Sequence, residues 1–376
     1  MKAPQPLIDC DIHCNPCERN PLLPFVSRKH RLALELKMDV KPSGGYANPF
    51  GVNRRDVAGL LPEEIIESHL DRYGVTHAII QPQNGTTFSL CHSIDVGNAL
   101  CRAINDWLVA TVLEKDERFF GSICVNTNDP KEAVKEMRRA AALHPRMVQV
   151  NVAGESTFLY GHRFYDPIHE ACEELGLVLA VHPGSEGAYH SSTPVGRPST
   201  YFEWHVGLPM TFMAHAASLV LEGTFEKFPG LMVLLTEGGY GWLPHLMWRM
   251  DKDFKALRAT TPWLKEEPSA IIRRHIRLTT QPVEEAPEPR HAIAILEMID
   301  AGRTLCFSSD FPHWDFDDPF RAFPSSIPAA MKQRILWENA RELYSRHIPT
   351  IPAIPAIPTA PAGETAAHPE NATSHV

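Results

Sequence analysis

Residues 7–17 read LIDCDIHCNPC, and this stretch decides the fold because it joins an apolar strand pattern to ionisable side chains. In an extended strand, side chains at positions i and i+2 point to the same face. Asp11 and His13 are therefore expected to point together, while Ile12 points to the opposite face. Cys10 is expected to share that opposite face and to be buried in the core. The pattern predicts a buried strand that ends in an Asp-x-His pair.

The cysteines of this stretch are weaker candidates for a metal site. Cys14 and Cys17 have the spacing of half a zinc knuckle, but no second Cys-x-x-Cys or His-x-x-x-His pair follows. The eight cysteines of the chain are scattered and form no disulfide framework. The first residues, MKAPQPLIDC, lack the apolar core of a signal peptide. We therefore expect reduced thiols and a cytoplasmic protein.

Further along the chain, short apolar runs alternate with amphipathic stretches. Eight runs are predicted as strands, at 7–13, 76–81, 119–125, 147–152, 177–182, 232–237, 276–281 and 304–310. Helical patterns lie at 62–73, 95–115, 130–143, 165–175 and 328–346. Eight buried strands separated by helices predict a closed parallel (β/α)₈ barrel of the TIM type. An open doubly wound sheet is disfavoured, because no G-x-G-x-x-G follows the first strand.

The barrel is expected to be a single domain over residues 1–347. Residues 14–61, rich in Pro, Gly and Asn, are expected to form a long active-site insertion after the first strand. Residues 348–376 are rich in Pro and Ala, which predicts a disordered tail. The formal net charge of −9 is spread without basic blocks, and no 18-residue apolar run exists, so neither nucleic-acid nor membrane binding is expected.

Ionisable residues also fall at the predicted carboxyl ends of three other strands. His182 ends the fifth strand, Glu237 the sixth and Asp310 the eighth. In a parallel barrel the chemistry is located at the carboxyl ends of the strands. Together with Asp11 and His13, these residues bring three carboxylates and two imidazoles to one mouth. Such donors suit a divalent zinc, manganese or iron ion.

Longer motifs surround these residues: DCDIH at 9–13, AVHPG at 180–184, FEKFPGLMVLLTEGGYGWLPHLMWRMD at 225–251, LTTQP at 278–282, SSDFPHWDFDDP at 308–319, AINDWLV at 103–109 and WENARELY at 337–344. With them, the chain resembles, over roughly residues 7–346, the amidohydrolase-related metal-dependent enzymes. The branch in question includes aminocarboxymuconate-semialdehyde decarboxylase and resorcylate-type decarboxylases. The resemblance implies that Asp11, His13, His182 and Asp310 hold a divalent metal and that Asp310 accepts a proton from an activated water.

The chain departs from the pattern of this family at three places. Asp11 stands where a histidine is usual, and Glu237 replaces the histidine of the sixth strand. The strand at 147–152 has no lysine, so a carbamate-bridged zinc pair is not expected. Glu237 adds a third negative charge, which burial makes costly. Three alternatives would offset this third charge. Glu237 could be protonated and act as general acid, it could pair with Arg249 or with the Gly238–Gly239 backbone, or a second metal could bind beside it.

His215 bears on the number of metal ions. It lies in an apolar helical stretch, MTFMAHAASLVLEG at 210–223. It is either a packing histidine or, if it faces the mouth, a further metal ligand and catalytic residue. The second alternative gives three carboxylates and three imidazoles, a set that resembles the dinuclear iron or manganese–iron oxygenases of the same branch. We expect one metal ion, with two as the alternative.

Five further residues are candidates for contacts with a substrate. His205 follows the fifth strand, Gln281 ends the seventh, and His313 and Trp314 follow Asp310. Arg249 lies one helical turn after His245, in the segment that follows the sixth strand.

Three functions follow as hypotheses. The first is a metal-dependent hydrolase or decarboxylase acting on a small carboxylated or cyclic organic substrate. The second is a dinuclear Mn/Fe or Fe/Fe oxygenase, and the third is a non-catalytic partner subunit of a hetero-oligomer. The family resemblance implies a homodimer or a heteromer with a paralogue.

Overall fold

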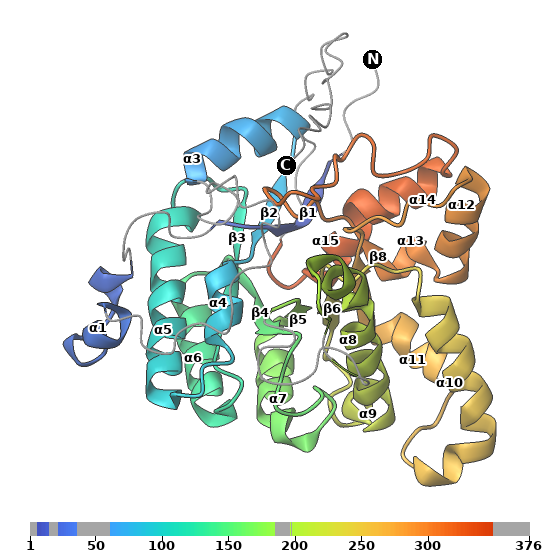
Figure 1. Ribbon diagram of the computed structural model, residues 1–376, viewed down its shortest axis with the longest axis horizontal. Coiled ribbons are helices and arrows are strands. Elements are labelled where there is room, and N and C mark those ends of the chain that lie inside the picture. Colours follow the sequence, from blue (N-terminus) through green and yellow to red (C-terminus); the bar gives the residue numbers. More distant parts are fainter. Residues whose placement is uncertain (1–5, 15–21, 36–60, 185–195, 197, 349–376) are drawn as a thin grey trace.

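The computed structural model describes residues 6–14, 22–35, 61–184, 196 and 198–348. Eight strands form one parallel sheet in the order in which they occur along the chain (Figure 1). The strands are β1 (Ile8–Ile12), β2 (His77–Ile80), β3 (Phe119–Cys124), β4 (Met147–Ala153), β5 (Val178–His182), β6 (Val233–Leu235), β7 (Ile276–Thr279) and β8 (Leu305–Cys306). All eight lie within the strands predicted from the sequence, apart from Ala153 at the end of β4.

The sheet curves round so that the segment after β8 meets β1. The Cys10 N–H donates to the Phe307 carbonyl at 3.0 Å, and the His13 N–H donates to the Phe311 carbonyl at 2.8 Å. Ile12 and Phe311 also form a parallel bridge. These bonds join the last strand to the first, and the predicted TIM-type (β/α)₈ barrel is confirmed.

Helices connect the strands and surround the barrel (Figure 1). They are α1 (Arg28–Glu35), α3 (Pro62–Ile65), α4 (Gln83–Phe88), α5 (Ile94–Trp107), α6 (Pro130–Leu143), α7 (Asp166–Leu175), α8 (Tyr201–Leu221), α9 (Thr224–Lys227), α10 (Leu243–Leu257), α11 (Pro268–His275), α12 (Pro289–Met298), α13 (Ala301–Thr304), α14 (Ala329–Gln333) and α15 (Asn339–Leu343). Short 3₁₀ turns lie at Leu23–Phe25, Arg163–Tyr165 and Arg258–Thr260, and π-helical turns at Ile66–Asp71, Leu108–Leu113 and Arg334–Glu338. None of the helices in the described part of the chain is long and apolar enough to cross a membrane.

Helix α8 leads from the barrel mouth along its outside, and its start is fixed by a capping box. The Thr200 hydroxyl accepts from the Glu203 N–H at 3.1 Å, while the Glu203 carboxylate accepts from the Thr200 N–H at 2.9 Å. These reciprocal bonds satisfy backbone donors that the first helical turn leaves open. Tyr201 and His205 are thereby set at the first turns of the helix, on the side of the mouth.

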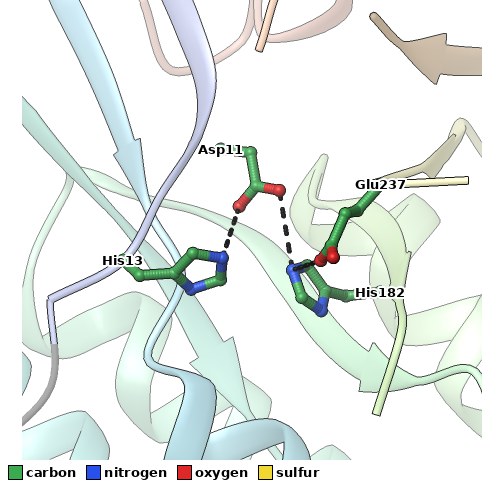
Figure 2. Close-up of side chains that lie close together, drawn as sticks. All are labelled: Asp11, His13, His182 and Glu237. Atoms are coloured by element: carbon green, nitrogen blue, oxygen red, sulfur yellow. Dashed lines mark ion pairs between the residues drawn. The ribbon is translucent and has the colours of Figure 1, made fainter. Parts of the chain in front are cut away.

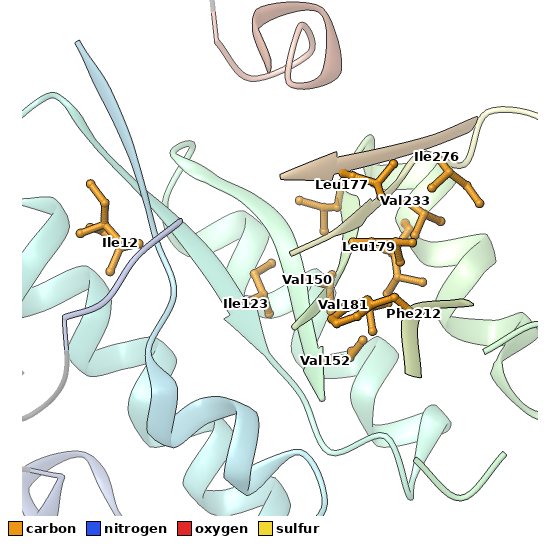
Figure 3. Packing of buried hydrophobic residues seen from close by; sticks show 14 of the residues in the cluster. Ile12, Ile123, Val150, Val152, Leu177, Leu179, Val181, Phe212, Val233 and Ile276 are labelled. Atoms are coloured by element: carbon orange, nitrogen blue, oxygen red, sulfur yellow. The ribbon is translucent and has the colours of Figure 1, made fainter. Parts of the chain in front are cut away.

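Apolar side chains pack in two layers. The larger layer lies between the strands and the helices, and Figure 3 shows Val181 next to Phe212 of α8, with Val150 and Ile123 further along the sheet. A smaller layer fills the barrel interior and includes Ile8, Cys10, Ile79, Phe120, Val148, Val178, Ala180, Leu234 and Cys306. Leu343, Tyr344 and Ile348 join this inner layer. The C-terminal segment therefore closes the end of the barrel opposite the mouth.

Strand β1 contains an irregularity between Asp9 and Ile12, where its register against β2 shifts. Cys10 is buried in the inner layer beside Ile8, but Ile12 is buried in the outer layer. Cys10 is thus a core residue, as predicted, yet the prediction that it shares a face with Ile12 is wrong. An irregular residue breaks the two-residue alternation of a strand, so side chains on either side of it change face.

Two predicted segments are only partly covered by the described residues. Within the insertion at 14–61, the described residues are Cys14, 22–35 and Leu61, and they include α1 and one 3₁₀ turn. The remainder of the insertion, with Cys17, and the tail beyond Ile348 lie outside the described residues.

Candidate metal centre

Four ionisable side chains converge at the carboxyl ends of β1, β5 and β6 (Figure 2). Asp11 lies between the two histidines: its Oδ1 is 3.4 Å from Nε2 of His13, and its Oδ2 is 3.5 Å from Nε2 of His182. Glu237 Oε2 lies 3.1 Å from the same nitrogen of His182. All four residues are buried. The barrel thus brings together the residues that sequence analysis placed at these strand ends.

Asp310 joins this cluster from the segment after β8. Its Oδ1 lies 2.9 Å from Nε2 of His13. His313 lies three residues further on, and its Nδ1 is 2.8 Å from Oδ1 and 2.9 Å from Oδ2 of Asp310. His13, Glu237, Asp310 and His313 form a second group of possible ligands that overlaps the first.

Backbone carbonyls orient the two central histidines. Nδ1 of His13 donates to the Gln81 carbonyl at 2.9 Å, and Nδ1 of His182 donates to the Pro183 carbonyl at 2.7 Å. These bonds leave Nε2 of each ring as the nitrogen that faces Asp11. The Gln81 amide also donates to Oδ1 of Asp11 at 3.1 Å. Such outer contacts are typical of histidines that ligate a metal.

Four buried atoms at the centre make no hydrogen bond in the described part of the chain: Oδ2 of Asp11, Nε2 of His13, Nε2 of His182 and Oδ1 of Asp310. Buried polar atoms are nearly always bonded, so a group of unbonded ones that face one another requires an explanation. Imidazole nitrogens and carboxylate oxygens are the donors that zinc, manganese and iron take in proteins. The residues therefore fit a divalent cation.

The backbone is strained at two of the carboxylates. Glu237 and Asp310 both have a φ of 59°, in the left-handed region that side chains other than glycine rarely adopt. Asp300 is the one other residue besides glycine with positive φ in the described part of the chain. Strain of this kind costs of order 1–3 kcal/mol at each residue and is concentrated at functional sites. It aims both carboxylates into the mouth.

The two histidines at the centre have opposite pKa shifts. Burial, followed by the neighbouring His313, lowers the pKa of His13 to about 3, so its ring is neutral. Burial also acts to lower the pKa of His182, but the charges of Asp11 and Glu237 outweigh it and raise that pKa to about 9. In the absence of a metal, the two carboxylates therefore favour the protonated, positively charged form of His182. A bound cation would supply this positive charge instead.

Burial and mutual repulsion act on the carboxylates. Burial is the largest cause that raises the pKa of Glu237, and the charge of Asp310 is the next. Burial likewise raises the pKa of Asp310, followed by the charges of Asp315 and Asp11. Neither lysine nor arginine is among the largest causes of either shift. The described residues therefore leave an excess of negative charge at the mouth that a divalent cation would offset.

The predicted substrate residues His205, Gln281 and Trp314 gather round one residue that sequence analysis missed, Asp315. Nε2 of His205 donates to Oδ2 of Asp315 at 3.1 Å, and the Gln281 amide donates to the same oxygen at 3.0 Å. The ring centroids of His205 and Trp314 are 5.4 Å apart, and the Trp314 indole donates to the Tyr201 hydroxyl at 3.0 Å. Asp315 stands two residues before another aspartate in an acidic run, which hid it among surface charges.

The structure decides between the two alternatives for His215 in favour of the packing histidine. Its Nδ1 accepts from the Tyr160 N–H at 3.2 Å, and its Nε2 donates to the Gly154 carbonyl at 2.7 Å. Burial lowers its pKa to about 4, so the ring is neutral. Both nitrogens are used by the backbone, so His215 has no lone pair for a metal. It joins α8 to the segment after β4 as a packing histidine.

The structure corrects the expectation for Arg249. Its side chain on α10 is 65% exposed and pairs with Asp253, Nε to Oδ2, at 2.8 Å. It therefore neither faces Glu237 nor belongs to the mouth. The carbonyls of Gly238 and Gly239 accept from the Trp242 indole. Among the described residues, Glu237 forms its ion pair with His182.

An eight-stranded parallel barrel with imidazoles and carboxylates at the carboxyl ends of its strands defines the class of barrel enzymes built around a metal centre. A sequence model of the amidohydrolase family matches residues 8–346. The chain belongs to this amidohydrolase family and is an enzyme, which removes the hypothesis of a non-catalytic subunit.

Two curated relatives are gamma-resorcylate decarboxylases. One, from Polaromonas sp., is 27% identical over 298 residues, which are 73% of this chain and 85% of that protein. The other, from Rhodococcus jostii, is 28% identical over 330 residues, which are 80% of this chain and 96% of that protein.

Solved structures share the fold at lower sequence identity. One is a 5-carboxyvanillate decarboxylase from Novosphingobium aromaticivorans in complex with manganese. It superposes with a TM-score of 0.69 at 18% identity, over 91% of this chain and 96% of that chain. Another is a dihydroxybenzoic acid decarboxylase from Polaromonas sp. with bound manganese and the inhibitor 2-nitroresorcinol. Its TM-score is 0.63 at 21% identity, over 91% of this chain and 97% of that chain.

Proposed function

We propose that this enzyme is a metal-dependent decarboxylase of small aromatic carboxylates. The observation that carries the proposal is the convergence of four unbonded buried donor atoms, on Asp11, His13, His182 and Asp310, at the barrel mouth. The decarboxylase activity of the gamma-resorcylate relatives, which share more than a quarter of their aligned residues with this chain, supports the reaction type. The manganese of the structural neighbours supports a divalent ion of that kind.

Asp11, His13, His182 and Asp310 are the residues that would hold the ion. When bound, a divalent metal acts as a Lewis acid, which polarises the oxygens of a substrate or lowers the pKa of a water. The Nδ1 bonds to Gln81 and Pro183 orient the rings of His13 and His182 for this role.

Asp310 is the proposed proton-transferring group. In decarboxylation, a proton adds to the ring carbon that bears the carboxylate, the bond between the two carbons breaks, and CO₂ leaves. The protonated carboxyl group of Asp310 gives its proton to that carbon and is protonated again from the solvent, so one proton is consumed for each CO₂ released. Nδ1 of His313 is hydrogen-bonded to Oδ2 of Asp310 and lies 2.8 Å from Oδ1, so His313 fixes the orientation of the carboxyl group. Glu237, 3.1 Å from His182, is the second carboxyl group available for proton transfer.

The mouth offers an aromatic wall for a planar substrate. Tyr201 and His205 lie with their ring centroids 5.7 Å apart, and Trp314 lies 5.4 Å from His205. Aromatic rings in such offset arrangements present flat apolar faces against which another ring packs. Gln281 and Asp315 supply polar atoms beside this wall. These features support an aromatic substrate over an aliphatic one.

A dinuclear oxygenase is the second candidate. The observation in its favour is the overlapping ligand group of His13, Glu237, Asp310 and His313, which could hold a further ion beside the first. The loss of His215 weakens it, because the set of residues that resembles the dinuclear oxygenases includes this histidine. A requirement for O₂ and about two equivalents of iron or manganese would favour this candidate.

A direct assay tests the first proposal. The protein, loaded with Mn²⁺, is incubated without added O₂ with 2,6-dihydroxybenzoate, 5-carboxyvanillate and related hydroxybenzoates, and released CO₂ is measured. We expect release from at least one of them, abolished by chelator and restored by Mn²⁺. Absence of release from every aromatic carboxylate, by protein that has bound the metal, would contradict the proposal.

A further inference from the structure

A second polar cluster lies behind the metal centre, on the outer side of β1. It consists of Asp9, His69 and Ser309, and all three are 0% exposed. Asp9 belongs to β1, His69 to the π-helical turn Ile66–Asp71, and Ser309 to the segment after β8. None of these residues belongs to the groups that could hold a metal. A buried aspartate at this place needs a reason, because burial of a carboxylate is costly.

Asp9 accepts four hydrogen bonds. Its Oδ1 accepts from the backbone N–H of Ser309 at 3.0 Å and of Asp11 at 3.3 Å. Its Oδ2 accepts from the Ser309 hydroxyl at 2.6 Å and from Nε2 of His69 at 2.8 Å. A carboxylate with this many donors is fully satisfied. The carboxylate of Asp9 therefore joins three parts of the fold: β1, the segment after β8 that contains Ser309, and the π-helical turn that contains His69.

These bonds act at the irregularity of β1. The register against β2 shifts between Asp9 and Ile12, and the N–H of Asp11 lies in this interval. Asp9 accepts that N–H and so supports the local conformation in which Asp11 turns into the mouth. The Asp310 N–H donates in turn to the Asp11 carbonyl at 3.1 Å.

In the segment after β8, Ser309 immediately precedes Asp310. Its N–H and hydroxyl are both held by Asp9, and its hydroxyl also accepts from the Phe311 N–H at 3.2 Å. The residues on both sides of Asp310 are thereby fixed, which supports the left-handed backbone at Asp310 itself.

His69 completes the cluster by packing. Its ring stacks on Phe311 with centroids 4.5 Å apart and an interplanar angle of 16°, and Tyr73 lies 5.3 Å away. This apolar surrounding fixes the ring so that Nε2 points at Asp9. It also excludes water from the bonds of Asp9, which strengthens them.

A serine, a histidine and an aspartate together suggest a nucleophilic triad, but the geometry excludes one. In such a triad the histidine uses one nitrogen for the serine and the other for the aspartate. Here the same Nε2 faces both, at 2.8 Å from Asp9 and 3.3 Å from the Ser309 hydroxyl. Ser309 is also fully buried, so no substrate reaches its hydroxyl.

We propose that Asp9, His69 and Ser309 are positioning residues that set the spacing between the Asp11 and Asp310 carboxylates and thereby tune the affinity of the metal centre. The proposal rests on the proposed function, since it takes Asp11 and Asp310 as ligands. The three residues act through the β1 irregularity and the β8 end, without contact with metal or substrate.

Two variants test it, with Mn²⁺ as the probe. His69→Phe keeps the aromatic stack and removes the donor to Asp9, while Ser309→Ala removes one hydroxyl. Dissociation constants of Mn²⁺ are measured from the paramagnetic resonance signal of the free ion, which disappears on binding. Loss of contacts that orient ligands typically weakens metal binding 10–100-fold, so we expect at least a tenfold increase in both dissociation constants. The signal of the bound ion should also change shape.

His275→Phe is the matched control. His275 is a buried histidine whose ring stacks on Phe225 at 4.5 Å and 15°, almost as His69 stacks on Phe311. Its Nδ1 lies 3.0 Å from the Leu231 carbonyl, away from the metal ligands. Thermal unfolding of the metal-free proteins should show comparable losses for the two histidine variants. Of these two histidine variants, only His69→Phe should lose Mn²⁺ affinity.

Wild-type Mn²⁺ affinity in both His69→Phe and Ser309→Ala would overturn the proposal. If His69→Phe does not fold, the result for Ser309→Ala decides alone, because that change is small. Failure of the wild-type protein to bind Mn²⁺ is a different outcome, which refutes the proposed metal centre itself.

Discussion

Glu237 and Asp310 carry the clearest signature of function at the scale of single residues. Both hold a left-handed backbone that neither side chain favours, and both are buried among other carboxylates. A fold selected for stability alone would place glycine, which adopts this conformation without steric cost, at such positions. The unfavourable backbone and the unfavourable charge coincide where the four unbonded atoms meet. The backbone conformation and the buried charge of these two residues destabilise the fold, but they place the two carboxylates in the site.

Glu237→Gly and Glu237→Ala measure this strain. Both variants remove the buried carboxylate, but only glycine relieves the left-handed backbone. Alanine is ordinarily the more stabilising residue, because glycine is more flexible in the unfolded chain. Here we expect the glycine variant to be the more stable by about 1 kcal/mol in chemical denaturation of metal-free protein. Equal stability, or a more stable alanine variant, would show that position 237 is not strained.

Asp310→Asn tests the proton transfer. Asparagine tolerates the left-handed backbone and keeps an oxygen that accepts from His313, so the fold should be retained. It does not accept and release a proton as a carboxylate does. We expect turnover to fall by about 10²–10⁴-fold, the usual contribution of a general acid or base. Circular dichroism controls for the fold, and turnover close to that of the wild type would remove Asp310 from this role.

At the scale of elements, the strands were predictable from sequence and the irregularity of β1 was not. Buried strands of a parallel barrel are short apolar runs, and the barrel rule then places His182, Glu237 and Asp310 at one mouth. An irregular residue leaves no mark in composition, so the change of face between Cys10 and Ile12 could not be foreseen.

Three site-related residues escaped or misled the sequence interpretation for similar reasons. His215 occurs on an apolar helical face that both a ligand and a packing histidine would show, and only its two backbone bonds decide between them. Asp315 is hidden in an acidic run. Asp9 looked like an ordinary strand residue, because its partners His69 and Ser309 are distant in sequence and are joined to it only by barrel closure.

Strand β2 provides a prediction about pH. His77, at its start, is 8% exposed and its ring lies 5.2 Å from that of Phe120, and burial lowers its pKa to about 4. In the unfolded chain a histidine titrates near 6.5. Between these values the unfolded chain binds a proton that the folded one does not, so stability falls as the pH falls from about 6.5 to 4.

His77→Phe should remove this contribution while preserving the ring contact. Comparison of the unfolding free energies at pH 7 and pH 4.5 should show a loss on acidification that is smaller in the variant by about 2 kcal/mol. Both proteins should still lose some stability on acidification, because the other buried histidines also titrate. An identical loss in wild type and variant would mean that His77 does not titrate as its burial indicates.

At the scale of the whole molecule, the two ends of the barrel are expected to have separate tasks. The mouth contains the charged cluster, whereas the opposite end is closed by the segment around α15. There the Tyr344 hydroxyl, fully buried, donates to Oε1 of Gln149 inside the barrel at 2.6 Å. Changes at this end should alter stability without altering the metal centre.

Tyr344→Phe tests that separation. It removes the hydroxyl and leaves the buried oxygen of Gln149 without this donor, which should lower the free energy of unfolding by about 1–3 kcal/mol. The Mn²⁺ affinity and the turnover of the folded protein should stay at wild-type values. A parallel loss of metal affinity would show that the closed end and the mouth are coupled.

Metal content tests the central claim most directly. Protein purified without chelator is analysed by mass spectrometry for manganese, iron and zinc, beside His182→Ala, which removes one proposed ligand. The proposed centre predicts about one equivalent of a divalent metal in the wild type and a large loss in the variant. A wild-type protein that neither contains nor takes up a divalent ion would contradict the account, and two equivalents would contradict its single-ion form.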